Sequence, residues 1–89
     1  MRSRIRIIAD LLLTLEQSND GLKITELVRR SNVPYVRLTE ILEELEKKGL
    51  IRQINEEEGQ VYIITQKGIK FLNEYRKFSK FAEGFGFEI

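Results

Sequence analysis

Apolar residues recur at helical spacing near the start of the chain. Within residues 4–17, the positions three or four apart are Ile5, Ile8, Leu12 and Leu15, with Leu11 beside them. This spacing places them on one face of an α-helix. The polar run Ser18–Gly21 follows and predicts a loop by its composition.

A second, shorter helix is expected to begin at Ile24 or Thr25 and to end near Ser31. Thr25 is a good N-cap residue, and Glu26 behind it suits the positive helix N-terminus. Leu27 faces inward in this helix. The preceding "LKI" is too short to form more than a small strand.

A third helix follows the tight turn "SNV". Pro34 fits its first turn, where the missing N–H costs nothing. The helix is expected to run to about Lys48 and to end at Gly49, because glycine is common just after the last turn of a helix. The residues that fall on its apolar face are Tyr35, Leu38, Ile41, Leu42 and Leu45.

The next two segments, "LIRQIN" and "QVYII", are rich in β-branched and apolar residues. Four residues, Glu56–Gly59, separate them, so the pattern predicts a β-hairpin with Gly59 supplying a positive φ in its loop. Thr65 is then expected to cap a fourth helix from Gln66 to Glu83, which Gly84 ends.

A short helix, a tight turn, a longer helix and a β-hairpin together describe a winged helix-turn-helix. The predicted fold class is therefore α+β, with three helices and a β-hairpin wing followed by a C-terminal helix. In this architecture the second helix of the pair enters the DNA major groove. The expected division is residues 1–65 as the winged domain and residues 66–89 as a dimerisation helix with an apolar tail.

Two stretches extend this interpretation beyond architecture: "YVRLTEILEELEKKGLI" and "VYIITQKGIKFLNEY". Over about Ile24 to Phe78 the chain resembles archaeal winged helix-turn-helix DNA-binding proteins and transcription regulators, in which a C-terminal helix forms an antiparallel coiled coil with its partner. The resemblance implies binding of double-stranded DNA as a homodimer, in transcription regulation or chromatin. The chain departs from that pattern in its short last helix, ~27 Å, and in its acidic third helix and wing.

Charge is spread unevenly along the chain. The net charge is +1 overall; residues 1–37 carry +3, residues 38–64 carry −4 and residues 65–89 carry +2. Three glutamates, Glu56, Glu57 and Glu58, stand at the hairpin tip, where they would cost about 1–2 kcal/mol beside phosphates at low salt. Phosphate contacts elsewhere can outweigh this cost. The tip therefore argues against a wing in the minor groove, but not against DNA binding.

Candidate DNA contacts come from the third helix and from the cations around it. Base readout uses the N-terminal part of the recognition helix, which nominates Tyr35, Val36, Arg37, Thr39 and Glu40. The remaining candidates, for phosphate contacts, are Arg4, Arg29, Arg30, Lys47 and Arg52. Tyr35 could instead be a core residue, and Glu40 or any single arginine could simply be solvated.

Aromatic residues on the fourth helix indicate a second interface. Phe71, Tyr75, Phe78 and Ala82 follow a spacing of four, three and four, which is typical of a coiled-coil seam, and Phe81 lies beside them. Leu72 and Ile69 are expected to pack on the winged core. We expect the apolar tail "FGFEI" to dock against the dimer interface, because it would otherwise form an exposed patch. The alternative is that the whole helix folds back on one core.

The chain has no His and no Cys, which removes the usual general base, the commonest metal ligand and any thiolate. We therefore expect no enzyme activity, cofactor or metal. The run "MRSRIRIIADLLLTL" is interrupted by Asp10 and is too short to span a membrane, so a cytoplasmic, nucleoid-associated protein without membrane contact is expected. Other hypotheses are a protein–protein module that binds a basic partner through its acidic third helix and wing, and a DNA-free structural dimer. No effector ligand is indicated.

Overall fold

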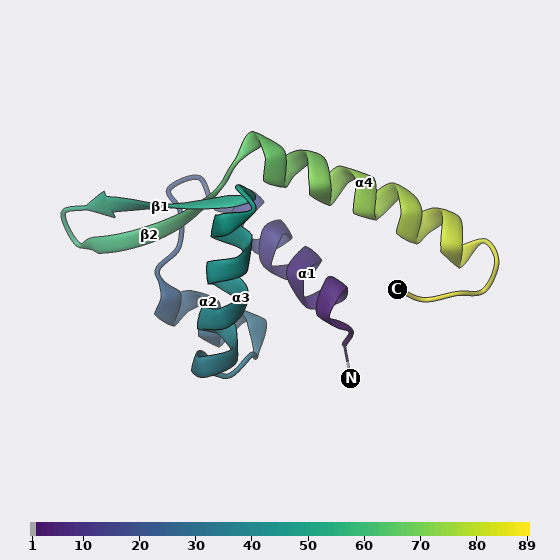
Figure 1. The fold of residues 1–89 in the computed structure, drawn as a ribbon, viewed down its shortest axis with the longest axis horizontal. Helices are drawn as coiled ribbons and strands as arrows, with labels where there is room; N and C mark the ends of the chain where they lie inside the picture. Colours follow the sequence, from purple (N-terminus) through teal and green to yellow (C-terminus); the bar gives the residue numbers. More distant parts are fainter. Residues whose placement is uncertain (1) are drawn as a thin grey trace.

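The computed structural model describes residues 2–89. Its elements, in chain order, are α1 (Arg4–Glu16), α2 (Ile24–Ser31), α3 (Tyr35–Lys47), β1 (Ile51–Glu56), β2 (Gly59–Ile64) and α4 (Gln66–Glu83). Helices α1 to α3 pack together, the hairpin extends to one side of them, and α4 extends to the other (Figure 1). The predicted α+β winged-helix class is confirmed.

The N-cap of α2 differs from the prediction. Leu22 pairs with Tyr62 through two backbone hydrogen bonds of 3.0 and 2.8 Å, which keep the chain extended up to Lys23. The helix therefore begins directly afterwards at Ile24, with Lys23 as its N-cap, and the prediction of a Thr25 cap was wrong. The Glu26 carboxylate closes this end by accepting a hydrogen bond from the Lys23 N–H at 3.3 Å.

The turn between α2 and α3 is held in one conformation by three residues. Asn32 adopts a left-handed conformation with φ +60°, which Asn tolerates better than most residues with a side chain. The buried Ser31 hydroxyl accepts a hydrogen bond from the Val33 N–H at 3.2 Å. Pro34 then serves as the N-cap of α3. The two helices are thus fixed relative to each other by local chemistry.

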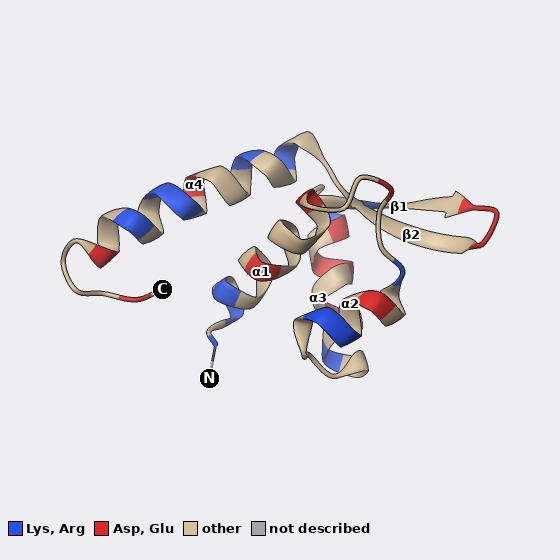
Figure 2. Cartoon of the chain, turned by 180° about the vertical axis from the view of Figure 1, so that it is seen from behind, with Lys and Arg blue, Asp and Glu red and all other residues tan. Residues whose placement is uncertain are grey.

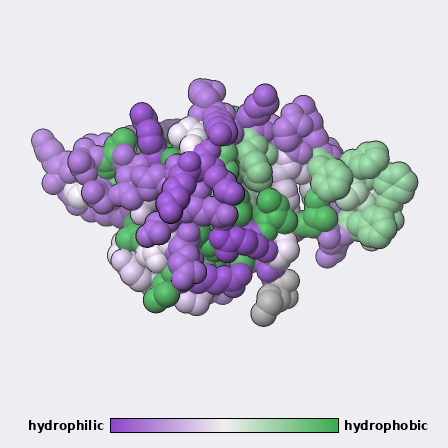
Figure 3. All heavy atoms as spheres, in the orientation of Figure 1, coloured by the Kyte–Doolittle hydropathy of each residue, from purple (hydrophilic) through white to green (hydrophobic). Residues whose placement is uncertain are grey.

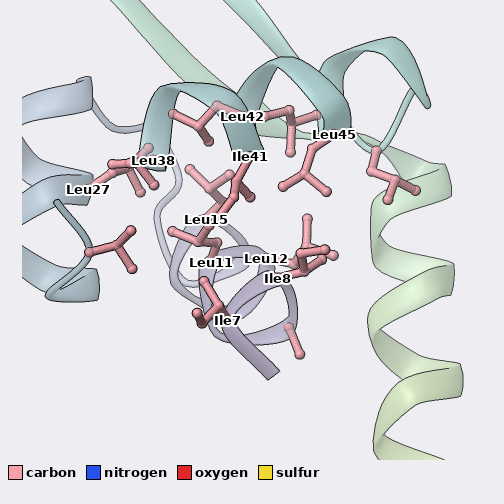
Figure 4. Packing of buried hydrophobic residues seen from close by; sticks show 14 of the residues in the cluster. Ile7, Ile8, Leu11, Leu12, Leu15, Leu27, Leu38, Ile41, Leu42 and Leu45 are labelled. Carbon is pink, nitrogen blue, oxygen red and sulfur yellow. The ribbon is translucent and has the colours of Figure 1, made fainter. Parts of the chain in front are cut away.

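One apolar core joins all four helices. Leu12 of α1, Leu27 of α2, and Leu38 and Ile41 of α3 have no exposed surface, and Leu72 of α4 is almost completely buried in the same cluster. Figure 4 shows how these side chains interlock between α1 and α3. The first half of α4 is therefore part of the packing of the winged domain.

The hairpin loop is shorter than predicted. β1 and β2 pair antiparallel with Ile54 opposite Val61 and with Glu56 opposite Gly59 as the last pair. Only Glu57 and Glu58 remain in the turn, so the expected four-residue loop was wrong. Neither glutamate has a positive φ, whereas Gly59 does at +124°. The glycine adopts the backbone conformation that lets it pair with Glu56 directly after the two-residue turn.

α4 is anchored to the end of α3 by its N-cap. The Thr65 hydroxyl accepts from the Gly68 N–H at 3.1 Å and donates to the Gly49 carbonyl at 2.6 Å. Further along, Arg76 pairs with Glu16 of α1 at 3.2 Å. The predicted bounds and cap of α4 are confirmed. None of the helices in residues 2–89 has both the length and the apolar character needed to cross a membrane.

Gly68 is required by a close approach between α4 and Leu50, the residue before β1. A Cβ atom built there would lie 2.2 Å from the Leu50 carbonyl oxygen and 2.7 Å from the Ile64 side chain. We expect Gly68→Ala to lower the free energy of unfolding by about 2 kcal/mol or more, because a backbone atom must move. Urea denaturation measures the change. Asn73→Ala on the exposed face of α4 is the control; equal stability of the two variants would contradict the expectation.

Candidate nucleic-acid interface

The N-terminal half of α3 presents several predicted contact residues to solvent. Val36 is 70% exposed and Tyr35 is 56% exposed, so Tyr35 is not a core residue. Glu40 is exposed as well. Thr39 is half-buried, and its hydroxyl donates to the Val36 carbonyl at 2.7 Å. This end of α3 combines apolar groups with one carboxylate.

Three arginines surround the turn between α2 and α3. Arg29 and Arg30 occupy the last turn of α2, and Arg37 lies in the first turns of α3. All three are exposed, and within residues 2–89 their side chains make no ion pair or hydrogen bond. Figure 2 shows basic positions on both sides of this turn. These guanidinium groups are therefore available to a partner.

The N-terminal arginines behave differently. Arg4, a predicted phosphate contact, donates a hydrogen bond to the Glu44 carboxylate of α3, and Lys48 approaches the other oxygen of that carboxylate at 3.4 Å. The Arg4 guanidinium and the Lys48 ammonium hold the pKa of Glu44 below its usual value. Arg2 pairs with Asp10 at 2.9 Å and also donates to the Ser31 carbonyl. These arginines contact the protein itself, which sequence spacing did not indicate.

Lys47 and Arg52 complete the predicted set at the other end of α3. Lys47 lies in the last turn of α3, and Arg52 stands on β1 opposite Ile63. Both are exposed, and neither makes an ion pair within residues 2–89. Lys47 and Arg52 therefore lie where α3 leads into the wing, at the opposite end of α3 from the arginines at the turn.

Sequence reasoning missed Tyr62 at the corner between α3 and the wing. Tyr62 pairs with Gln53, whose side chain donates to Glu46 of α3 at 3.2 Å. Burial raises the pKa of the Tyr62 hydroxyl, and the negative charge of Glu46 adds to this effect. The Tyr62 hydroxyl therefore resists ionisation more than an exposed tyrosine does. The sequence "QVYII" could have indicated this position, because side chains alternate between the two faces of a strand and Tyr62 therefore lies on the face opposite to Val61.

The wing tip belongs to an acidic surface. Glu56, Glu57 and Glu58 line a hollow of about 540 Å³ together with Asp20 and Glu26, and Lys23 is also part of its lining. The tip carboxylates are exposed, in red at the end of the hairpin in Figure 2. A phosphate backbone is repelled by such a surface. The tip and the arginines at the turn therefore differ sharply in charge.

The five predicted dimer residues fall into two groups. Phe78 is 58% exposed and Phe81 is 64% exposed, whereas Phe71 and Tyr75 pack partly against the core of their own domain. Ala82 is buried, and its carbonyl accepts from the Phe87 N–H at 3.0 Å as the tail turns back. The Tyr75 hydroxyl fixes the returning tail by donating to the Ile89 carbonyl at 2.7 Å. The tail thus folds along its own helix.

An apolar patch remains at the C-terminal end of α4. We name the exposed phenylalanines Phe78, Phe81, Phe85 and Phe87 the aromatic end. The rings of Phe81 and Phe85 lie 5.1 Å apart between centroids and are tilted by 59°. Figure 3 shows this patch in light green at the end of α4.

Comparisons with known proteins agree with this geometry. A family model described as winged helix-turn-helix matches residues 1–83. Among solved structures, the chain is similar to that of Sso10a-2, a DNA-binding protein from Sulfolobus solfataricus, with a TM-score of 0.81 and 26% sequence identity over 94% of this chain and 85% of that one. The search of curated proteins found no match. The chain belongs to the winged helix-turn-helix family.

Proposed function

We propose that the protein binds double-stranded DNA as a homodimer and acts as a transcription regulator or chromatin-associated protein. The observation that carries this proposal is the set of arginines without an ion pair in residues 2–89, Arg29, Arg30 and Arg37, beside the exposed N-terminal half of α3. Cations in this position can contact phosphates while the helix reads base edges. The similarity to a DNA-binding protein supports the same function.

Charge along α3 suggests how the helix meets DNA. Its C-terminal half carries Glu43 and Glu46, which phosphates would repel, whereas the charge of Glu44 is offset by Arg4 and Lys48. The N-terminal end therefore enters the major groove first, with Arg29 and Arg30 on the flanking phosphates. There Val36 and the Thr39 methyl group can contact thymine methyl groups, and Glu40 can accept a hydrogen bond from a cytosine amine.

The aromatic end supports the proposed dimer. Exposed phenylalanines on one helix end are unusual on a monomer surface unless they bind a partner. Phe78 and Phe81 project from the part of α4 that lies beyond its buried Leu72. Pairing of two α4 helices through these rings would bury the patch and would display two α3 helices on one assembly. Residues 66–89 would then act as the dimerisation segment, as the sequence predicts.

Fluorescence anisotropy with a random-sequence duplex tests the proposed DNA binding. About four phosphate contacts predict that affinity falls roughly a hundredfold when salt rises from about 50 to 200 mM. An affinity that does not change with salt, or no binding at micromolar protein and low salt, would contradict the proposal.

The acidic hollow beside the wing favours a second candidate function. Its carboxylates, together with the acidic C-terminal half of α3, could bind a basic protein partner. This candidate predicts no salt-sensitive binding to duplex DNA, so the anisotropy experiment separates the two functions.

Reversing the charge of the wing tip should strengthen DNA binding. We expect the triple change Glu56→Lys, Glu57→Lys and Glu58→Lys to tighten binding to random duplex DNA about tenfold or more at low salt, because repulsion is replaced by attraction. Anisotropy at about 50 and 200 mM salt measures the change, which should shrink at the higher salt. Weaker binding of the triple variant would show that the carboxylates have a positive role in the complex.

A further inference from the structure

A shallow groove lies where α1, the C-terminal end of α3 and the start of α4 meet. Its volume is about 350 Å³. The buried side chains of Ile8, Leu45 and Leu50 form its floor, and Ile5 and Phe71 form its walls. Ile5 is 40% exposed, so the apolar surface is open to solvent. Small-molecule sites have volumes from about 300 to 1,000 Å³, and this groove is at the lower end of that range.

The rim of the groove is charged. Arg4 and Lys48 stand there and share the Glu44 carboxylate, one oxygen each. Two cations and one anion leave one positive charge next to an apolar floor. Only the Nη2 atom of Arg4 donates within residues 2–89, so the Nε and Nη1 donors of its guanidinium face no protein acceptor. The rim already holds the Glu44 carboxylate between two cations, and the free donors of Arg4 could bind a second carboxylate.

We propose that this groove binds a small organic molecule with a single carboxylate and an apolar body. The carboxylate would accept from the unused donors of Arg4 and would lie near Lys48, where it balances the remaining positive charge. The apolar body would lie between Ile5 and Phe71 and would remove their surfaces from water. A doubly charged phosphate ester fits less well, because Glu44 would repel its second charge.

The position of the groove gives such a molecule contact with two functional elements. Glu44 and Leu45 belong to α3, which carries the proposed DNA-reading face, and Phe71 belongs to α4, which carries the aromatic end. An occupant would therefore touch both elements at once. Its binding can nevertheless be measured without DNA, so this inference stands apart from the proposed function.

Phenylacetate is a suitable probe, and its uncharged amide is the matched control compound. Methyl NMR spectra of the full chain should show saturable shifts for Ile5 and Ile8 at millimolar phenylacetate, with a much weaker response to phenylacetamide. Arg4→Gln should weaken binding of phenylacetate about tenfold, since it removes a charged hydrogen-bond donor. Arg4→Lys should restore part of it, and Arg52→Gln, an exposed arginine on β1, should leave it unchanged.

Three results would overturn the proposal. One is the absence of saturable shifts at Ile5 and Ile8. Another is equal affinity for phenylacetate and its amide, which would make the charged rim irrelevant. The third is a set of shifts that depends on protein concentration without any probe, which would show that a second copy of the chain fills the groove. A failure of DNA binding changes none of these measurements, so the two proposals fail separately.

Discussion

Reversing both arginines at the end of α2, Arg29→Glu with Arg30→Glu, should weaken binding to duplex DNA about 30- to 100-fold at low salt. Both side chains are exposed beside the helix-turn-helix turn and make no ion pair within residues 2–89. Each reversal replaces attraction to a phosphate by repulsion, an effect of about 1–2 kcal/mol per site near water-like dielectric before screening. Anisotropy titration with random and mixed-sequence duplexes should show a similar loss for every sequence, because phosphate contacts are not sequence-specific.

The control must change the net charge by the same amount at another surface. Lys70→Glu with Lys77→Glu does this on the exposed outer side of α4. If only the α2 variant loses DNA affinity, Arg29 and Arg30 contact the DNA. Equal losses in both variants would instead mean that overall charge controls binding, and the proposed interface would be wrong. The folded state of each variant is checked by circular dichroism.

Phe78→Asp should convert the proposed dimer to a monomer in analytical ultracentrifugation at micromolar concentration. Phe78 is 58% exposed on one chain, so the substitution does not disturb the core of that chain. In a dimer closed by the aromatic ends, the same change would place two carboxylates in an apolar interface. Burying unpaired charges in such a place costs several kcal/mol, enough to dissociate a micromolar dimer.

Lys77→Asp is the matched control for this experiment. It introduces the same carboxylate at the neighbouring position, on a side chain that is 75% exposed and makes only a 3.5 Å pair with Glu74. The control should keep the mass of the unchanged protein. If Phe78→Asp also keeps that mass, the aromatic end is not the interface, and Phe71, Tyr75 and Ala82 are then the remaining predicted contacts. DNA affinity measured on the same samples shows whether dimerisation contributes to binding.

The structure also bears on how the acidic composition of the wing and α3 fits a DNA-binding fold. Acidic groups occupy the hairpin tip and the C-terminal half of α3, whereas the unpaired arginines cluster at the other end of the motif. On DNA, this uneven charge would orient the domain with the turn between α2 and α3 toward the phosphates. Charge at the tip also discourages edge-to-edge pairing of the exposed hairpin with other chains.

The sequence by itself determined the order of elements and most of their bounds. Local signals were sufficient for this: the three- and four-residue spacing in α1 and α3, and the Thr65 cap and Gly84 end of α4. Helical periodicity and capping act over a few residues, so they can be read without knowing the fold. The winged helix-turn-helix architecture followed from that order and is confirmed.

Only the tertiary structure decided which of the candidate side chains remain available. Arg4 and Arg29 look alike in the sequence, yet Arg4 pairs with Glu44, forty positions away, while Arg29 makes no ion pair within residues 2–89. The bridge from Leu22 to Tyr62 likewise keeps the chain extended up to Lys23, so that Lys23 and not Thr25 is the N-cap of α2. These outcomes depend on contacts between distant segments, which periodicity cannot encode because it records only the face on which a residue lies.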